Sequence, residues 1–496
     1  MKPFLDQHAR LHLDRVFDTY SHRTALVAPS GAFTFRDIQQ DLARVIDNLR
    51  GLGVGQGQVV GIHAPNSLIH VYLFLAAWVM GFTWVPLDPK APPGKVPAGV
   101  NLDVIVFSGD TGIWPVRVIS SEALYDPDTI RPNNTEPGNT EQENTGPASI
   151  SQPSLSPGGI PLDRECAIIF TSGSTGGPKG VVHTVDSFYY SALGSVEFFS
   201  LTPEDSWLIS LPLFHVGGIL VVLRTLLCGG TAILHESPGR PGPAILKYRP
   251  TFLSLVPTQL QRLLDMPEMT AALSVCRGIL LGGAPCPGPL MEKALDTGIP
   301  VLATYGSTEA CAMVTAVRPG AARPERFSSG RVLPYRKVML AEDSRVVISG
   351  KTLFNHYIEN GRPKKGVRDG KFYTQDLGTW DATGNLIITG RRDLVFISGG
   401  ENIHPHEIEN AMVETGLVQD AVVVPVEDPV FGRVPWAFVL SEIPLDPTRI
   451  QSALKKKLPS YKIPKTILPL PPTAMGKGIK RDRNALEKTA AAMGKQ

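Results

Sequence analysis

The sequence predicts an α/β protein with a large N-terminal domain and a small α+β C-terminal domain. A chain of 496 residues is too long for one ordinary core, so we expect at least two domains. Near the N-terminus, helix-like segments such as 35–52 alternate with short β-branched runs such as 59–62, which is typical of α/β layering. The sequence GRRD at 390–393 marks a break, and the residues after it, about a hundred, are enough for a second domain. We therefore place a hinge near Asp393, between domains 1–392 and 393–496.

The composition indicates a globular protein whose partner is a small molecule. Apolar residues make up 43% and charged residues 19%, and the net charge is only +2, which excludes a disordered chain and a nucleic-acid binder that works through bulk charge. From Arg449 to the C-terminus, however, there are twelve Lys or Arg residues and two acids. Such a tail is most often a solvated surface, and an anionic ligand such as a nucleotide or coenzyme A is the alternative.

Cysteine usage and the apolar segments predict a cytoplasmic protein without an integral membrane segment. The five cysteines form no C-x-x-C pair, so neither a disulfide framework nor a zinc site is expected. The N-terminus contains acids and no apolar core segment, so we expect no secretory signal. The apolar run 71–87 is at the short limit for a membrane span. We interpret it as a buried helix that ends near Gly81, followed by a short buried strand.

The remaining organisation places functional loops at strand ends. Residues 126–161 are rich in Asn, Thr, Glu, Ser, Pro and Gly, so they cannot bury a core, and we expect a mobile surface insertion. Strand signals recur at 251–256, 278–281 and 301–305, and each ends in a polar or glycine-rich turn. In open α/β sheets such strand ends line the ligand crevice.

A loop rich in Gly, Ser and Thr follows the apolar run that begins at Ala167. Its backbone N–H groups and hydroxyls can point at an anion, and its lysine adds a full charge. The pattern differs from the usual P-loop because Lys179 follows Pro178 and precedes Gly180. The alternative is an ordinary polar surface loop. The residues that we assign to nucleotide binding in this loop are Thr171, Ser172, Gly173, Ser174, Thr175, Gly176 and Lys179.

Six motifs in order give the chain a family resemblance. They are the loop at 171–180, YGSTE at 305–309, YTQD at 373–376, GR at 390–391, SGGENI at 398–403, and a C-terminal lysine. With these motifs, nearly the whole chain resembles the adenylate-forming superfamily of acyl-CoA synthetases, luciferases and adenylation domains. The resemblance implies stacked α/β layers with a small β-barrel in the N-terminal domain, and a mobile C-terminal domain. It also implies ATP, Mg²⁺ and coenzyme A as cofactor and co-substrates.

The resemblance assigns roles in nucleotide binding. It implies that Tyr305 stacks on adenine, that Asp376 accepts both ribose hydroxyls, and that Arg391 reinforces the ribose. Thr308 resembles a contact of the α-phosphate, and Glu309 resembles the Mg²⁺ ligand, since a hard cation prefers carboxylate oxygen. Taken alone, Tyr305 could be a core aromatic, Asp376 a turn residue and Glu309 a solvated acid. The other residues assigned to the adenine and phosphate site are Gly283, Ala284, Pro285 and Gly306.

The C-terminal domain contributes a lysine and two glycines. The family pattern Lys-x-x-Arg-x-x-Leu fits Lys480, which we assign to adenylation because the developing charge on the α-phosphate needs a preorganised cation. Lys477 stays a competitor because it directly follows a glycine. The resemblance implies that the small domain rotates after adenylation and that Gly399 and Gly400 then line a tunnel for the pantetheine thiol. As plain turn residues, these glycines would need no ligand.

One apolar segment predicts the acid that is bound. LPLFHVGGILVVLRTLL contains His215 and Arg224, and a charged Arg among apolar residues needs a partner such as a ligand carboxylate. A structural ion pair or an exposed guanidinium is the alternative. With SGGENIHPHEIE and GIKRDRNAL, the segment resembles the o-succinylbenzoate-CoA ligases of menaquinone biosynthesis. This resemblance implies that Arg224 binds the aromatic carboxylate and that His215 is a movable, catalytically important wall of the acid pocket.

Several functions remain open at this stage. Benzoate-type or fatty acyl-CoA ligases belong to the same class, and the buried Arg224 discriminates against the benzoate group. A carrier-protein adenylation enzyme and a non-catalytic nucleotide-binding relative are further alternatives. The sequence leaves the oligomeric state undecided, with a homodimer as one option.

Overall fold

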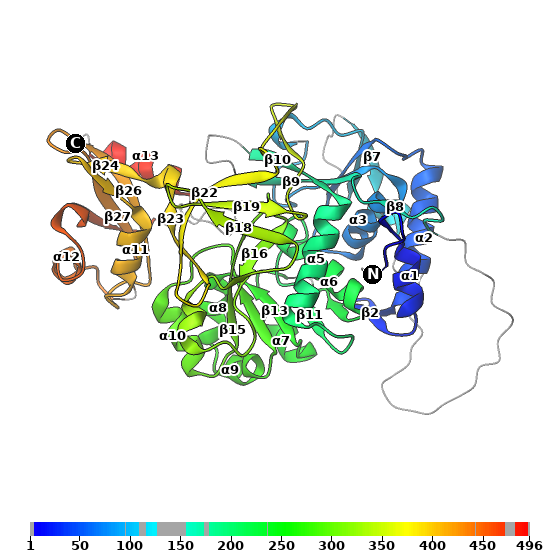
Figure 1. Cartoon of the computed structure of the whole chain (residues 1–496), viewed down its shortest axis with the longest axis horizontal. Helices are drawn as coiled ribbons and strands as arrows, with labels where there is room; N and C mark the ends of the chain where they lie inside the picture. Colours follow the sequence, from blue (N-terminus) through cyan, green and yellow to red (C-terminus); the bar gives the residue numbers. More distant parts are fainter. Residues whose placement is uncertain are drawn as a thin grey trace. The chain divides into compact units, whose positions relative to one another are not determined.

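The computed structural model describes residues 4–94, 96–108, 116–125, 155–172, 178–235, 237–441, 443–471 and 482–494. The chain divides into two compact units, and each mixes helices and strands (Figure 1) as the predicted α/β class requires. The first unit comprises Met1–Leu253, Thr308–Ala312 and Lys351–Asp369, and the second comprises Ser254–Ser307, Met313–Gly350 and Gly370–Gln496. The predicted domain border at Asp393 lies inside the second unit and stays a prediction.

The first unit contains an eight-stranded sheet with the strand order β21-β20-β10-β9-β5-β4-β6-β7. Strands β7, β6, β4, β5 and β9 are parallel, and β10, β20 and β21 continue the sheet with antiparallel pairings. The strands are β4 (Val59–His63), β5 (Thr83–Pro86), β6 (Val104–Phe107), β7 (Arg117–Ser120), β9 (Glu165–Ser172), β10 (Pro178–Thr184), β20 (His356–Glu359) and β21 (Arg362–Lys364).

A second set of strands in the first unit includes a β-α-β connection. Strand β11 is followed by helix α6 and then by β12, which pairs in parallel with both β11 and β2, and β3 pairs with β2 in antiparallel fashion. Helices α5 and α6 pack against each other (Figure 1). These elements are β2 (Thr24–Ala28), β3 (Gly31–Thr34), α5 (Val185–Phe199), β11 (Ser206–Leu208), α6 (Val216–Cys228) and β12 (Thr231–Ile233); further helices are α1 (Leu13–Thr19), α2 (Phe35–Gly51), α4 (Ser121–Leu124) and α7 (Gly242–Tyr248).

The apolar run 71–87 forms a buried helix and a strand, as predicted. Helix α3 (Leu68–Met80) is buried over most of its length and ends at Gly81, whose φ of 82° is the left-handed conformation that favours glycine. Strand β5 follows directly. In the part of the chain that the structure describes, no helix is long and apolar enough to cross a membrane.

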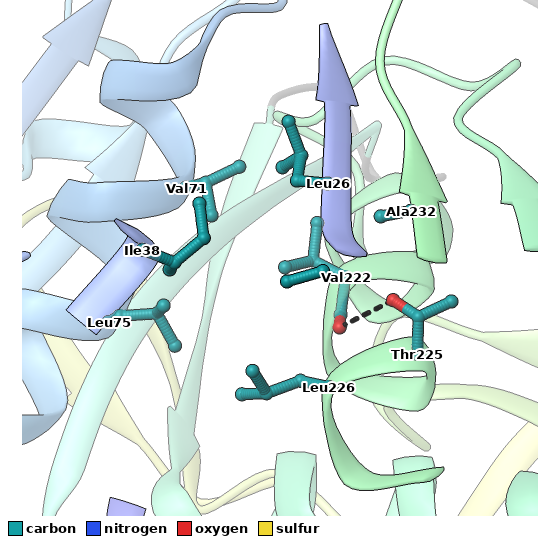
Figure 2. A pocket seen from close by; sticks show the side chains of 9 residues that line it. Leu26, Ile38, Val71, Leu75, Val222, Thr225, Leu226 and Ala232 are labelled. Atoms are coloured by element: carbon teal, nitrogen blue, oxygen red, sulfur yellow. Dashed lines mark hydrogen bonds between the residues drawn. The ribbon is translucent and has the colours of Figure 1, made fainter. Parts of the chain in front are cut away.

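A small cavity lies where α2, α3 and α6 meet β2 and β12 (Figure 2). Its volume is about 10 Å³, which is at the lower limit for one water molecule. The lining is almost wholly apolar, and the one hydroxyl, on Thr225, donates to the carbonyl of Val222 at 3.0 Å within the helix. Because a buried water needs several polar partners, this apolar cavity is poorly suited to hold a water molecule. Its lining residues are Ala25, Leu26, Ile38, Val71, Leu75, Val222, Thr225, Leu226 and Ala232.

The C-terminal end of the predicted insertion is part of the fold. Residues 126–154 lie outside the described residues. At the end of the insertion, the carboxylate of Asp14 accepts hydrogen bonds from the backbone N–H groups of Leu155 at 3.0 Å and Ser156 at 3.2 Å. Strand β8 (Ile160–Pro161) then pairs with β1 (Arg10–Leu11). The N-terminal segment therefore fixes the point at which the insertion rejoins the core.

The second unit begins with parallel strands and continues with a small antiparallel sheet. Strands β14 and β15 are parallel, and β16 pairs with β17 in antiparallel fashion. Strands β18, β19, β22 and β23 form a four-stranded antiparallel sheet in that order, and the small β-barrel stays a prediction. The elements are α8 (Pro257–Leu264), α9 (Pro267–Ser274), β14 (Gly278–Leu281), α10 (Gly288–Asp296), β15 (Val301–Ser307), β16 (Ala312–Ala316), β17 (Arg331–Val332), β18 (Arg336–Leu340), β19 (Arg345–Gly350), β22 (Lys371–Trp380) and β23 (Leu386–Arg391).

The C-terminal residues form the predicted α+β arrangement. Along β26, Ala421 and Val423 belong to a core cluster with α11 and α12, whereas Val422 and Val424 belong to a cluster with Leu486 of α13. This split follows the period of two in a strand, so β26 is covered on both faces. The elements are β24 (Phe396–Ser398), β25 (Glu401–Ile403), α11 (Pro405–Val413), β26 (Asp420–Asp428), β27 (Gly432–Leu440), α12 (Pro447–Leu454), β28 (Thr466–Pro469) and α13 (Arg483–Met493).

Candidate active site

The predicted phosphate loop connects two neighbouring antiparallel strands. Thr171 near the end of β9 pairs in register with Lys179 near the start of β10. Four of the predicted ligands, Gly173, Ser174, Thr175 and Gly176, lie outside the described residues, as does the side chain of Ser172. The apolar run before the loop is a strand, β9, as predicted. Lys179 itself lies on the strand after the loop, β10, which the sequence did not indicate.

Lys179 is held by an acid that the sequence did not reveal. Its Nζ lies 3.1 Å from Oε1 of Glu359 and 5.4 Å from the ring centroid of Tyr357, and both partners are on β20, which pairs with β10. Lys364 donates to the other oxygen of Glu359 at 2.7 Å. The Lys364 ammonium, together with Lys179, lowers the pKa of the Glu359 carboxyl below its usual value. Glu359 is therefore an anion shared by two lysines.

Glu309 is positioned by a tyrosine and by a sharp turn. The Tyr357 hydroxyl donates to Oε1 of Glu309 at 3.0 Å, and the backbone carbonyl of Glu309 accepts from the N–H of Phe354 at 2.8 Å. Cys311 and Ala312 both have positive φ angles, of 53° and 74°, which is uncommon for residues other than glycine and indicates local backbone strain. Thr308 and Glu309 precede this turn and are partly exposed.

The donor at Glu309 fits the predicted magnesium ion. A carboxylate suits a hard cation, and Mg²⁺ is usually bound by one or two carboxylates together with substrate phosphates and water. Within the described ranges, no cluster of three or more His, Cys, Asp or Glu side chains could hold a metal ion. A magnesium ion at Glu309 would take further ligands from substrate phosphates and water, as such sites usually do.

In the second unit, Tyr305, Asp376 and Arg391 form one hydrogen-bonded group. The Tyr305 hydroxyl donates to Oδ2 of Asp376 at 2.8 Å, and Nη1 of Arg391 donates to Oδ1 at 3.1 Å. Asp376 and Arg391 are cross-strand neighbours on β22 and β23. Burial and the Asp376 carboxylate raise the pKa of Tyr305 far above its usual value, so the hydroxyl stays a donor. Arg391 also forms two hydrogen bonds to Asp393, at 2.9 and 2.7 Å.

The predicted opposite wall of the adenine site lies at the neighbouring strand end. Leu281 pairs with Ala303 in the parallel strands β14 and β15, so Gly283 and Tyr305 are each two residues farther along their strands. Gly283 has a φ of 80°, which a residue with a side chain rarely adopts. Ala284 and Pro285 follow it, and Gly306 follows Tyr305; all of these neighbours are exposed. Tyr305 and Gly283 therefore lie near the ends of adjacent parallel strands, and their role as the two walls of an adenine site stays a prediction.

His215 caps the N-terminus of helix α6, and Arg224 lies within the same helix. His215 precedes the first turn as the N-cap residue, and its ring lies 4.4 Å from that of Phe214. Arg224 is only 2% exposed, and its guanidinium carbon lies 5.0 Å from the ring centroid of Trp207, which is itself buried. The guanidinium does not extend to solvent, and a cation–π contact accounts for part of its stabilisation in the core. The tryptophan partner was not apparent from the sequence.

The two predicted tunnel glycines form the turn between β24 and β25. Gly399 and Gly400 have φ angles of 57° and 89°, and both are exposed. The Gly399 N–H donates to the carbonyl of Phe431 at 2.9 Å. The two candidate lysines, Lys477 and Lys480, lie outside the described residues.

Comparison with known proteins identifies the family. The profile of the AMP-binding enzyme family matches residues 13–357, and the profile of the AMP-binding enzyme C-terminal domain matches residues 407–477. The chain belongs to the AMP-binding enzymes. This membership agrees with the ordered motifs and with the two groups of side chains described above.

Two curated relatives of this AMP-binding enzyme share an activity in their names. The 2-succinylbenzoate–CoA ligase of Listeria monocytogenes is 30% identical over 469 residues, which cover 93% of this chain and 95% of the relative. The 2-succinylbenzoate–CoA ligase of Bacillus subtilis is 33% identical over 315 residues, which cover 61% of this chain and 64% of the relative.

Solved structures agree with this relationship. The o-succinylbenzoate CoA synthetase of Bacillus subtilis, in complex with an acyl-adenylate intermediate, matches with a TM-score of 0.79 and 26% identity over 96% of this chain and 97% of that chain. The same enzyme with ATP and magnesium ion matches with a TM-score of 0.75 and 26% identity, over 92% and 95%. Large and small domains of an AMP-binding enzyme are therefore both present here.

Proposed function

We propose that this AMP-binding enzyme is an ATP-dependent ligase that converts o-succinylbenzoate, ATP and coenzyme A into o-succinylbenzoyl-CoA, AMP and pyrophosphate. The observation that carries the proposal is the likeness to the Listeria ligase over 93% of this chain and 95% of that protein. The bound acyl-adenylate in the Bacillus structure supports the same intermediate here. Other aryl- or acyl-CoA ligases share the chemistry and differ in the acid.

The reaction has two steps. In the first, an oxygen of the succinyl carboxylate attacks the α-phosphorus of ATP, the bond to the β-phosphate oxygen breaks, and pyrophosphate leaves with its electron pair. In the second, the thiol of coenzyme A loses its proton, the sulfur attacks the acyl carbon, and AMP leaves. Adenylation is needed because a free carboxylate has no good leaving group for the thiol to displace.

The nucleotide residues divide into those for the base and ribose and those for the phosphates. We assign Tyr305 to stacking on adenine, and Asp376 to the ribose hydroxyls with Arg391 as support. The hydrogen bonds of Tyr305 and Arg391 to Asp376 support this assignment because they fix the carboxylate before a ligand binds. Thr171, Lys179 and Thr308 would contact phosphates. Glu309 would hold Mg²⁺, which neutralises phosphate charge when bound.

The acid and thiol assignments rest on other elements. Arg224 would bind the aromatic carboxylate, and His215 would form the movable wall of the acid pocket. The burial of Arg224 supports a role in the interior, where a carboxylate would be a strong partner. We assign Lys480 to adenylation, a hinge to Asp393, and the thiol tunnel to Gly399 and Gly400.

A pyrophosphate-release assay tests the proposal. The enzyme is supplied with ATP, Mg²⁺ and each of o-succinylbenzoate, benzoate and a medium-chain fatty acid, with and without coenzyme A. We expect o-succinylbenzoate to be preferred by about 10- to 150-fold in kcat/KM, because loss of a charge-assisted carboxylate contact costs about 1.5–3 kcal/mol. Equal activity with benzoate would reject the specific acid and keep the ligase class. Release of no pyrophosphate with any acid would reject the enzyme class.

Two further assignments accompany the proposal. We place the enzyme in the reducing cytoplasm, which is consistent with five free thiols among its cysteines. A homodimer is the oligomeric state to test, by sedimentation velocity with and without ATP.

A further inference from the structure

Glu309 is held twice by the segment that leads into β20 and forms it. The Tyr357 hydroxyl donates to Oε1 of Glu309 at 3.0 Å. Three residues earlier in the sequence, the N–H of Phe354 donates to the backbone carbonyl of Glu309 at 2.8 Å. All three residues belong to the first unit. One segment therefore fixes both the main chain and the side chain of the acid that we assign to Mg²⁺.

The two oxygens of the Glu309 carboxylate differ in their surroundings. Oε1 accepts from Tyr357, whereas Oε2 has no hydrogen-bond or ion-pair partner among the residues that the structure describes. An ionised carboxylate can accept through both oxygens, so Oε2 keeps its full capacity for a further ligand. Because the bond to Oε1 restricts rotation of the carboxylate, it also sets the direction of Oε2.

The Tyr357 ring is itself fixed by its neighbours. The ring of Phe354, a residue that is only 2% exposed, lies 4.5 Å from it between centroids, at an angle of 54°. Gly366 packs so closely on the Tyr357 ring that a Cβ at this position would lie 2.5 Å from Cε2 of the tyrosine. Because such close packing leaves the ring little room to move, the position of the hydroxyl is well defined.

The same ring also contacts the lysine that we assign to the phosphates. Nζ of Lys179 lies 5.4 Å from the centroid of the Tyr357 ring, which is within the range of a cation–π interaction. A phenylalanine at position 357 would keep the ring and this contact, and would remove only the hydroxyl. One substitution therefore separates the contact with Glu309 from the contact with Lys179.

We propose that Tyr357 is a positioning residue that sets the affinity of the ATP-bound enzyme for Mg²⁺ through the carboxylate of Glu309. The proposal rests on the proposed function, in which Glu309 holds Mg²⁺. Groups that hydrogen-bond to a metal-binding side chain fix its orientation, and their replacement typically lowers metal affinity or activity about 10- to 100-fold. Without the Tyr357 hydroxyl, the carboxylate has to be ordered when the metal binds, and this ordering weakens metal binding.

The test is titration calorimetry with α,β-methylene-ATP, which cannot release pyrophosphate, so no turnover is needed. Its affinity for the full-length protein is measured in excess Mg²⁺ and in EDTA, and the ratio of the two affinities gives the coupling between metal and nucleotide. In Tyr357→Phe this ratio should fall about 10-fold or more, while the affinity in EDTA should stay within about twofold because Lys179 keeps its contact with the ring. In a Glu309→Gln background, Tyr357→Phe should change the ratio no further, because both variants act through one carboxylate.

Tyr248 supplies a matched control. Nζ of Lys247 lies 4.8 Å from its ring centroid, so this tyrosine of α7 also has a lysine ammonium over its ring but no contact with Glu309. Tyr248→Phe should leave the ratio of affinities unchanged. In the pyrophosphate assay, the Mg²⁺ concentration for the half-maximal rate should rise about tenfold in Tyr357→Phe, and excess Mg²⁺ should restore kcat to within about threefold of wild type. A general loss of folded protein would not be restored by the metal in this way.

The outcomes separate this proposal from the proposed function. An unchanged ratio in Tyr357→Phe, with a lower ratio in Glu309→Gln, would reject the role of Tyr357 and leave Glu309 as the metal ligand. A higher ratio in Tyr357→Phe would also overturn the proposal, because the hydroxyl would then weaken metal binding by competing for the carboxylate. An unchanged ratio in Glu309→Gln would reject the assignment of Glu309 to Mg²⁺ and the proposal for Tyr357 with it. The calorimetry contains no acid, so a failure of o-succinylbenzoate as the substrate would leave its result unchanged.

Discussion

Replacing Glu359 with glutamine should make ATP bind more tightly. Lys179, which we assign to the phosphates, lies 3.1 Å from Glu359. In this assignment, phosphate oxygens and the Glu359 carboxylate would compete for the same ammonium group, so ATP would have to displace an internal anion. Glutamine has nearly the same shape but no charge, and its competition with ATP should be much weaker.

The magnitude follows from the distance and the exposure of the pair. Two unit charges 3.1 Å apart gain about 5 kcal/mol at an effective dielectric of about 20. Both side chains are about a quarter exposed, at 23% and 24%, so solvent and side-chain entropy cancel most of this gain. Partly exposed pairs retain about 1 kcal/mol, which corresponds to a factor of about 5 in binding. We therefore expect Glu359→Gln to lower KM for ATP about three- to fivefold, with kcat unchanged.

The assay is the initial rate of pyrophosphate release against ATP concentration, with saturating acid and low salt. A Lys364 variant is a control in which KM for ATP should change in the opposite direction, because Lys364 donates to the other oxygen of Glu359 at 2.7 Å. In Lys364→Met, Glu359 is left to Lys179 alone, and KM for ATP should rise. A higher KM for ATP in Glu359→Gln would refute the reasoning, since it would mean that Glu359 orders Lys179 for the ligand. An unchanged KM would show that the Lys179–Glu359 ion pair contributes no net free energy against ATP binding.

Three further predictions concern the ribose, the acid and acid stability. Asp376→Asn should lower kcat/KM for ATP about 10- to 100-fold, because hydrogen bonds to a charged acceptor contribute about 1.5–3 kcal/mol, while GTP and ATP should be affected alike. Arg224→Met should raise KM for o-succinylbenzoate at least about tenfold in the pyrophosphate assay but leave KM for ATP within twofold. A lower Tm together with a weaker binding of ATP would instead favour a purely structural arginine. Burial lowers the pKa of His70 and of His183 from 6.5 to about 4, so the unfolded chain binds more protons between these values and stability falls as the pH drops below about 6.5. His70→Asn should flatten the decline of Tm between pH 7.5 and 5, and a slope equal to that of wild type would contradict the assignment.

Local signals in the sequence predicted those features that depend on a few neighbouring residues. The run 71–87 has a glycine where the helix ends, and Gly81 indeed adopts the left-handed conformation there. The two strand ends that carry Gly283 and Tyr305 were also apparent, because each apolar run stops at a polar or glycine-rich turn. In both cases, the determining interactions lie within about one turn or one strand of the residues concerned.

Long-range partners could not be predicted in the same way. Glu359 contacts Lys179 because β20 pairs with β10, which is more than 170 residues away in the sequence, and Tyr357 of the same strand donates to the distant Glu309. The sequence of β20, HYIE, contains no feature that specifies this pairing. Arg224 is similar: burial in an apolar helix could be anticipated, but the ring of Trp207 beneath its guanidinium could not.

The partners of Asp376 and Lys179 within the protein differ in charge, and this difference has a functional consequence. Asp376 is held by two donors, a hydroxyl and a guanidinium, that do not resemble a ribose and leave its remaining lone pairs for the ribose hydroxyls. These contacts can persist when ATP binds, so they preorganise the site. Lys179 is instead held by a carboxylate, an anion like phosphate, so in the proposed role of Lys179 this contact would have to break when ATP binds. Weakening the partners of Asp376 should therefore impair ATP use, whereas weakening the partner of Lys179 should improve ATP binding. Tyr305→Phe and Glu359→Gln, compared in the same titration of ATP, should move KM in opposite directions.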